Sequence, residues 1–185
     1  MINIFSCYVF GSALVRSADA EIARTFIAAV LRRERIAPGE AVVRADRGME
    51  MTSKPVCMLL DKLGIKQSHS RPRVSDDNPF IESSFKTLKY HPTFPERFGS
   101  LSDGQAFFAP YFDWYNNVHR YSGIRMLTPA TVHHGLEAAS FAARHAVMLA
   151  AYSANPDRFA AGEPTLAMLP AEVWINQPNH DELAA

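Results

Sequence analysis

The sequence predicts a mixed α/β protein in which helices cover a sheet. Short runs of β-branched and aromatic residues alternate along the chain with segments of helical periodicity. The length of 185 residues is sufficient to bury a core, and 48% hydrophobic with 21% charged residues is typical of a folded, soluble protein. No apolar run is long enough to span a bilayer, so the sequence implies no membrane role.

The chain begins with strand patterns and continues with a helix pattern. Residues 2–5 and 8–15 are apolar runs rich in aromatic and β-branched side chains, which favour two buried strands joined tightly. Ser17 is the expected N-cap of the first helix, whose apolar residues recur at helical spacing. Pro38 and Gly39 are expected to end this helix.

A strand, a helix and a further strand are predicted next. Residues 41–45 form a short apolar run that leads directly into an Asp-Arg-Gly sequence. Thr52 or Ser53 is the expected cap of the following helix, and Gly64 is its expected stop. Residues 65–70 predict a brief polar strand. The alternation of strands and helices implies a mixed sheet, and active sites in such sheets gather at strand ends.

Helix patterns dominate the rest of the chain. Asn78 is a cap and Pro79 opens the next helix. An aromatic stretch over residues 107–118 has helical spacing, which favours core packing over stacking on nucleic-acid bases. Pro110 requires that this helix start nearby or kink. Further helices are expected after Thr128-Pro129 and over residues 138–152, before an irregular tail.

Charge, cysteine and histidine content narrow the function classes. The net charge is zero, but residues 44–97 hold ten Lys or Arg against seven Asp or Glu. Cys7 and Cys57 lack the spacing of a zinc knuckle or a redox motif and indicate reduced thiols in a cytosolic protein. His119, His133 and His134 lack companion Cys or carboxylate residues at zinc-ligand spacing, so we expect surface or hydrogen-bonded histidines.

Two acidic residues occupy positions that suit phosphodiester chemistry. Asp46 follows the strand predicted over residues 41–45, and Glu82 lies in the first turn of a later helix. Phosphodiester cleavage and transfer use two divalent cations about 4 Å apart, held by carboxylates. Such hard oxygen ligands favour Mg²⁺ or Mn²⁺. Lys86 and Lys89 share the helix face of Glu82 and would lie along a phosphate backbone.

Both carboxylates also have purely structural explanations. Asp46, in an Asp-Arg-Gly sequence, is a turn former. Glu82 and Lys86, four residues apart on one helix, are spaced to form an exposed ion pair worth ~0.3 to 0.5 kcal/mol. The residue pattern by itself leaves the structural and the catalytic explanations open.

Several longer motifs occur in order along nearly the whole chain. They are Arg44-Ala45-Asp46-Arg47-Gly48, Leu63-Gly64-Ile65-Lys66-Gln67-Ser68-His69-Ser70-Arg71-Pro72, Asp77-Asn78-Pro79-Phe80-Ile81-Glu82, Phe85-Lys86-Thr87-Leu88-Lys89-Tyr90, Trp114-Tyr115-Asn116, His119-Arg120 and Thr128-Pro129. Together they resemble the integrase-type catalytic core of insertion-sequence (DDE) transposases. The resemblance implies a ribonuclease-H-like, retroviral-integrase-like mixed sheet flanked by helices. It also implies an Asp-Asp-Glu triad, in which Asp46 matches the second aspartate and Glu82 the glutamate.

The resemblance also implies a function. It indicates the catalytic-core part of a DNA transposase, a polynucleotidyl transferase that cleaves element ends and joins them to target DNA with two Mg²⁺ or Mn²⁺ ions. By the same resemblance Asp46 and Glu82 are the metal ligands. DNA and a second copy or a full-length transposase are the expected partners, in the bacterial cytoplasm at the nucleoid. The side chains expected to contact DNA are Arg71, Arg73, Asn78, Lys86, Lys89, His119 and Arg120.

One departure from the family pattern concerns the first catalytic aspartate. The strand that carries it lies upstream of the segment that resembles residues 2–7, so in this numbering it would fall before Met1. The first strand of the sheet would then be missing as well. Asn3, Cys7 and Ser12 also stand where the family usually shows Asp, Arg and Trp.

These observations define the expected domains and activity. We expect residues 1–135 to form an integrase-like core, incomplete at its N-terminus, and residues 136–185 to form a C-terminal helix and an irregular tail. We expect this polypeptide alone to be inactive in strand transfer, because two carboxylates cannot easily hold two metals. The alternatives are a nonenzymatic remnant that binds DNA or pairs with intact transposase, and a generic nuclease of the same fold.

Overall fold

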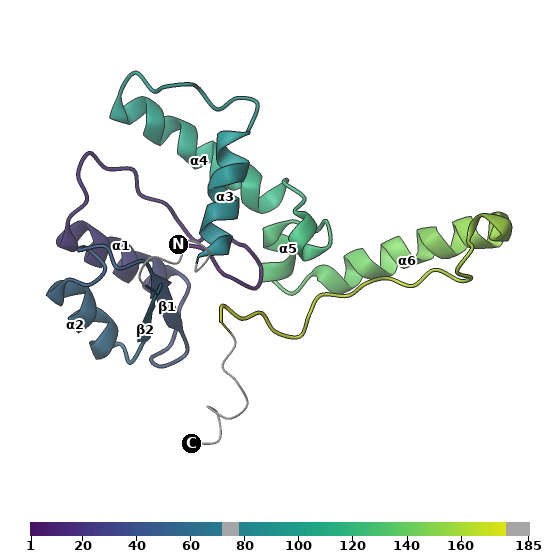
Figure 1. The fold of residues 1–185 in the computed structure, drawn as a ribbon, viewed down its shortest axis with the longest axis horizontal. Helices are drawn as coiled ribbons and strands as arrows, with labels where there is room; N and C mark the ends of the chain where they lie inside the picture. The colour runs from purple at the N-terminus through teal and green to yellow at the C-terminus, as the bar shows by residue number, and fades with distance from the viewer. Residues whose placement is uncertain (72–77, 177–185) are drawn as a thin grey trace. The chain divides into compact units, whose positions relative to one another are not determined.

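The computed structural model describes residues 1–71 and 78–176 (Figure 1). Two strands and a series of α-helices follow one another along the chain: α1 (Ala20–Arg33), β1 (Val42–Ala45), α2 (Lys54–Lys62), β2 (Lys66–His69), α3 (Pro79–Lys89), α4 (Leu101–Asn117), α5 (Pro129–His133) and α6 (Glu137–Ala154). Short 3₁₀ turns are η2 (Ser122–Ile124) and η3 (Pro156–Arg158). Within the described ranges, none of the helices is long and apolar enough to cross a membrane.

The chain forms two compact units, each built from segments that are separate in sequence. The first unit comprises Met1–Ile2, Phe10–Phe108 and the described residues 174–176, and the second comprises Asn3–Val9 and Ala109–Val173. The boundary between Phe108 and Ala109 lies inside α4. The N-terminal segment therefore contributes to both units.

The first unit contains a two-stranded parallel sheet. β1 and β2 pair in a register that places Val42 opposite Lys66 and Ala45 opposite His69. A parallel pair requires a crossover connection, and α2 supplies it. The predicted mixture of helices and strands is confirmed.

The core of the first unit joins this sheet to α1 and α2, which pack against each other. Val56 and Leu60, one turn apart on α2, are only 0% and 1% exposed. Burying each such side chain contributes roughly 1.5–3 kcal/mol. Four more buried residues complete the cluster: Ile27, Leu31, Val43 and Ile65.

The predictions for this part of the chain are largely confirmed. The strands predicted over residues 41–45 and 65–70 form as β1 and β2, each slightly shorter than expected. Of the two predicted caps of α2, Thr52 and Ser53, the N-cap residue is Ser53. Gly64 follows the C-cap of α2 and adopts φ +62°, a left-handed conformation that glycine tolerates better than any other residue.

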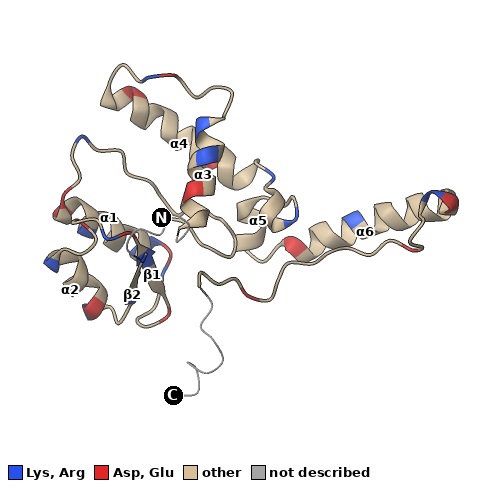
Figure 2. Cartoon of the chain, viewed as in Figure 1, with Lys and Arg blue, Asp and Glu red and all other residues tan. Residues whose placement is uncertain are grey.

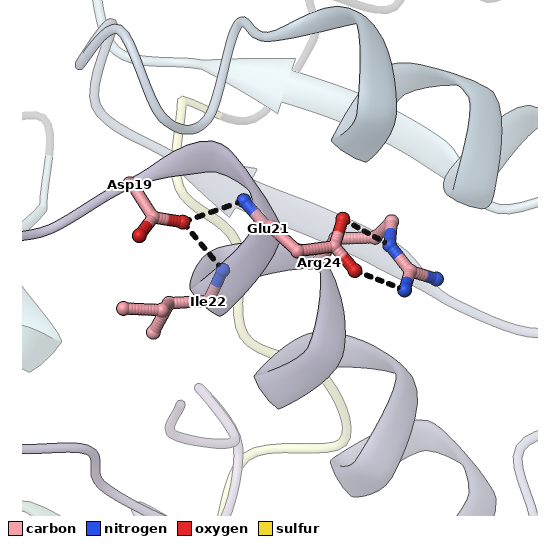
Figure 3. Close-up of polar contacts among 4 residues, drawn as sticks. All are labelled: Asp19, Glu21, Ile22 and Arg24. Carbon is pink, nitrogen blue, oxygen red and sulfur yellow. Dashed lines mark hydrogen bonds and ion pairs between the residues drawn. The ribbon is translucent and has the colours of Figure 1, made fainter.

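The first helix differs from the prediction at both of its ends. Its N-cap is Asp19 and not Ser17, because the Asp19 carboxylate accepts hydrogen bonds at 2.8 Å from the N–H groups of both Glu21 and Ile22 (Figure 3). An ionised cap also interacts favourably with the helix dipole. The helix ends at Arg33, before the predicted stop at Pro38, with Arg35 at φ +55°.

The pair of strands predicted over residues 2–15 is reduced to single bridge residues, Ile2 and Val9, and no extended strand forms in that range, all of which the structure describes. Asn3 Oδ1 accepts hydrogen bonds from the N–H groups of Phe5 and Ser6, both at 2.9 Å. Cys7 then adopts φ +57°. This local turn uses backbone groups that a strand ladder would need, which is how Asn side chains compete with regular structure.

The remaining helices follow the sequence signals with one correction. α3 opens at Pro79, α5 begins directly after the cap Thr128, and α6 occupies the predicted alanine-rich segment. α4 begins at Leu101, well before Pro110, so the alternative in which the aromatic helix starts near Pro110 does not occur. Pro110 has no N–H, and the helix therefore lacks one backbone hydrogen bond at that point.

We predict that Asp19→Ala lowers the free energy of unfolding by about 1 kcal/mol, because two amide groups at the start of α1 lose their acceptor. Urea denaturation followed by circular dichroism measures the change. Ser17→Ala is the matched control and is expected to have no measurable effect. Equal destabilisation by the two substitutions would contradict the assignment of the cap.

Candidate metal site and nucleic-acid surface

Asp46 lies at the exit of β1, where its backbone is tied to the end of β2. The Ser70 N–H donates to the Ala45 carbonyl at 3.0 Å, and Arg47 Nε donates to the Ser70 carbonyl at 3.2 Å. His69 Nδ1 lies 3.0 Å from the Asp46 carbonyl oxygen. Because a carbonyl only accepts, Nδ1 must carry the hydrogen in this contact. These bonds fix the position from which the Asp46 side chain extends.

The Asp46 carboxylate is exposed and takes part in a turn. Its Oδ1 accepts a hydrogen bond from the Gly48 N–H at 3.1 Å. A Cβ at Gly48 would lie 3.1 Å from both Asp46 Oδ1 and Glu50 Oε2, so a larger residue there would push against both carboxylates. The turn-forming role considered for Asp46 is therefore present, and it occupies one of the two carboxylate oxygens.

The loop that follows Asp46 is held by a polar side chain from β2. Gln67 Nε2 donates to the Met51 carbonyl at 2.6 Å, and Cys57 Sγ donates to Gln67 Oε1 at 3.5 Å. Arg44 Nη1 donates to Ser68 Oγ at 2.9 Å across the two strands. These supporting contacts could not be predicted from the sequence, because no local pattern links the residues that make them.

Glu82 lies in the first turn of α3, exposed to solvent. An acidic residue in that turn interacts favourably with the helix dipole. In the part of the chain that the structure describes, the ion pairs are Arg24–Glu21 and Arg33–Glu34, so Glu82 and Lys86 do not form the exposed pair considered as an alternative. Figure 2 shows acidic and basic segments on α3.

The donor chemistry of Asp46 and Glu82 suits a hard divalent cation, since both offer carboxylate oxygens. Over residues 1–71 and 78–176, no group of three or more His, Cys, Asp or Glu side chains lies close enough together to hold a metal ion. The two carboxylates could therefore supply only part of a metal site. Their convergence stays a prediction.

The predicted DNA contacts are distributed over both units. Lys86 and Lys89 are exposed on α3, and Asn78 is the residue before this helix. Arg71 is exposed, whereas Arg73 lies outside the described residues. The other two predicted contacts, His119 and Arg120, belong to the second unit.

The aromatic residues of α4 from Tyr111 onward belong to the second unit. Tyr111 and Tyr115 are buried, and the His119 ring stacks on Tyr115 with centroids 5.4 Å apart. Burial raises the pKa of Tyr111 to about 12 and also raises that of Tyr115, so both phenols stay protonated at neutral pH. These contacts support the interpretation of the aromatic stretch as core.

Asn116, the last residue of the Trp-Tyr-Asn motif, has a structural role in the second unit. Its Oδ1 accepts from the Val9 N–H and its Nδ2 donates to the Val9 carbonyl, both at 2.9 Å. Asn116 is 7% exposed, so these bonds satisfy polar groups that water does not reach easily. They hold the segment Asn3–Val9 within the second unit.

Two other candidate residues of the sequence also have structural roles. His133 stacks on Tyr8 with ring centroids 4.4 Å apart, and its Nδ1 lies 3.4 Å from Ser6 Oγ. Cys7 is buried, and burial raises the pKa of its thiol to about 11. The thiol therefore stays protonated at neutral pH and is a poor nucleophile.

Comparison with known proteins finds a family whose sequence model matches the central segment of the chain. Residues 63–129 match the sequence model of the family described as integrase core domain. The matched segment runs from the end of α2 to the start of α5. It contains Glu82 and Lys86, whereas Asp46 precedes it.

A transposase is similar over a longer region. The chain is 26% identical over 129 residues to the transposase for insertion sequence element IS904 from Lactococcus lactis subsp. lactis (strain IL1403). The match covers 69% of this chain and 51% of the relative, so the chain spans about half the length of that transposase. Both matches confirm the predicted resemblance to the integrase-type catalytic core of insertion-sequence transposases.

We predict that Asn116→Ala destabilises the protein by roughly 2–4 kcal/mol, because the N–H and carbonyl of Val9 lose their partners in a buried place. The neighbouring Asn117→Ala is the matched control. Asn117 is exposed and bonds only to Asp113 within the same helix, so we expect a change below about 0.5 kcal/mol. Thermal or urea unfolding gives both values, and similar values for the two variants would contradict the proposed role.

Proposed function

We propose that this chain supplies the catalytic-core part of a DNA transposase and adopts part of a ribonuclease-H-like fold. The observation that carries the proposal is the position of Asp46 at the carboxyl end of β1, held there by His69 and Ser70 from the paired strand. The match of residues 63–129 to the integrase core domain supports it. The proposed substrates are the ends of a mobile element and target DNA.

In this proposal Asp46 and Glu82 hold Mg²⁺ or Mn²⁺ through their carboxylate oxygens. When bound, such an ion polarises the phosphodiester and stabilises the charge that develops on its oxygens. The contribution of the chain is to position the ligands, one by a strand end and the other by a helix turn. The turn at Gly48 holds Asp46 Oδ1 and leaves the other carboxylate oxygen for a metal.

The exposed lysines of α3 are proposed to bind the DNA backbone. Lys86 and Lys89 follow Glu82 by one and two turns on the same face of α3. A DNA strand along this face would place phosphates beside both lysines and the reacting phosphate beside the Glu82 carboxylate. The described residues include no ion pair that involves either lysine. Their charges are therefore available to an external anion.

We predict that the double variant Lys86→Gln, Lys89→Gln weakens binding of a DNA duplex that carries an element end. The slope of log K against log salt is expected to fall by about 2, because each lysine that is removed leaves one phosphate without its cation. Fluorescence anisotropy at several salt concentrations measures both quantities. The matched control is Lys54→Gln, Lys62→Gln, which removes the same charge from α2 of the same unit. Equal weakening in the two double variants would contradict a binding surface on α3.

We further propose that residues 1–185 alone do not carry out strand transfer, since they provide two of the three carboxylates that the resemblance implies. The purified chain is expected to join no element-end oligonucleotides in Mg²⁺ or Mn²⁺. If the chain does join them in a metal-dependent reaction, and Glu82→Gln abolishes the joining while Asp61→Asn leaves it intact, the proposed inactivity is refuted. The same result would support Glu82 as part of the metal site. Random nicking of a plasmid without joining would instead indicate a nuclease.

A nonenzymatic role is the second candidate, and the exposed lysines of α3 favour it equally. In that role the chain binds DNA, or pairs with an intact transposase and reduces its activity. Co-purification with a full-length transposase, together with an absence of joining, would distinguish this role from that of a catalytic subunit.

A further inference from the structure

Two arginine side chains bind one turn of the second unit and a third arginine lies in that turn, and the proposed function does not account for two of the three. The turn lies between α4 and α5, where Tyr121 and Leu127 form an isolated antiparallel bridge. Between them, Arg125 and Met126 both adopt φ +58°, a left-handed conformation that is unfavourable for side chains with a Cβ. Two such residues in succession need support from their surroundings.

Arg144 of α6 provides this support. Its Nη1 donates to the Arg125 carbonyl at 2.5 Å and its Nη2 donates to the Met126 carbonyl at 2.7 Å. The guanidinium therefore binds both carbonyls of the left-handed pair with its two-pronged geometry. This arrangement holds the turn in one conformation and fixes the direction in which Arg125 extends.

The Arg120 guanidinium lies close to that of Arg144, and Arg125 extends from the turn itself. Arg120 Nη1 donates to the same Met126 carbonyl at 3.4 Å, which places it within about 6 Å of Arg144 Nη2. Arg125 Nε donates to the Met168 carbonyl at 3.3 Å. Figure 2 shows the corresponding basic segments on the loop between α4 and α5 and on α6.

These three positive charges make no ion pair with a carboxylate of the described residues. Among the described residues, no carboxylate lies within 4.0 Å of Arg120, Arg125 or Arg144, and the neutral carbonyls that they contact do not balance their charge. Like charges at this separation repel each other, and an external anion would relieve that repulsion. Arg120 and Arg125 are exposed, so such an anion can reach them.

We propose that Arg120, Arg125 and Arg144 form a site for phosphate groups of duplex DNA, with Arg120 and Arg125 as the donors and Arg144 as the residue that positions their turn. Guanidinium groups match phosphate oxygens in geometry and bind them with charge-assisted hydrogen bonds. The choice of DNA among polyanions rests on the proposed function. The site extends the predicted contact at Arg120 to a cluster built from α6 and the turn.

Anisotropy titrations of the full chain with a labelled DNA duplex test the site. Arg120→Gln and Arg125→Gln are each expected to weaken binding about three- to tenfold and to lower the slope of log K against log salt by about 1. Arg158→Gln is the matched control, since it removes one exposed positive charge from the same unit outside the cluster. The double variant Arg120→Lys, Arg125→Lys keeps the charges and is expected to recover most of the slope.

The outcomes separate this inference from the proposed function. In one outcome, removal of the α3 lysines weakens DNA binding, whereas Arg120→Gln and Arg125→Gln do not. This outcome would overturn the arginine site and leave the proposed function standing. Retention on heparin that depends on Arg120 and Arg125, without DNA binding, would overturn DNA as the ligand and the proposed function together. If Arg158→Gln weakens DNA binding as much as Arg120→Gln and Arg125→Gln do, binding depends on total charge and not on this site, and the proposal is overturned.

Discussion

The parallel pairing of β1 with β2 is the constraint on which the geometry around Asp46 depends. Its register sets Ala45 opposite His69, so both strands end at the same edge. Side chains alternate between the two faces of a strand, and a slip by one residue would turn Val43 out of the core that it shares with Val56 and Ile65. Burial of these side chains therefore determines where Asp46 emerges.

Elements with local signals could be predicted from the sequence, whereas those decided by distant contacts could not. Gly64 and Pro79 set the end of α2 and the start of α3 within a residue or two. The apolar segment near the N-terminus has the pattern of a strand, but the N–H and carbonyl of Val9 bind Asn116, which is 107 positions away. No property of residues 2–15 alone reveals such a partner.

The same distinction applies to the candidate site. The place of Asp46 after an apolar run indicated a strand exit, and Pro79 indicated that Glu82 lies in a first helical turn. The contacts of His69 and Gln67 with the loop after β1 depend on strand register, which a single sequence does not specify. The positions of Asp46 and Glu82 in the secondary structure were therefore predictable one at a time, but the side chains that bind the loop after β1 were not. In the second unit the predicted boundary after residue 135 stays a prediction, although Arg144 of α6 binds carbonyls on the other side of it.

The observed contacts test the structural explanations of the two carboxylates, while the catalytic explanation stays a proposal. Glu82 makes no ion pair with Lys86 in the described structure, so its place in α3 is explained only by a helix-dipole effect of roughly 0.3–1 kcal/mol. Asp46 does form a turn, but the single bond from Gly48 occupies one lone pair of one oxygen. A turn former needs no more than that bond, while a metal ligand needs the remaining oxygen to be exposed and fixed in direction. His69 and Ser70 bind the backbone of Asp46 and Ala45, which fixes where the Asp46 side chain begins, and its role as a metal ligand stays a proposal.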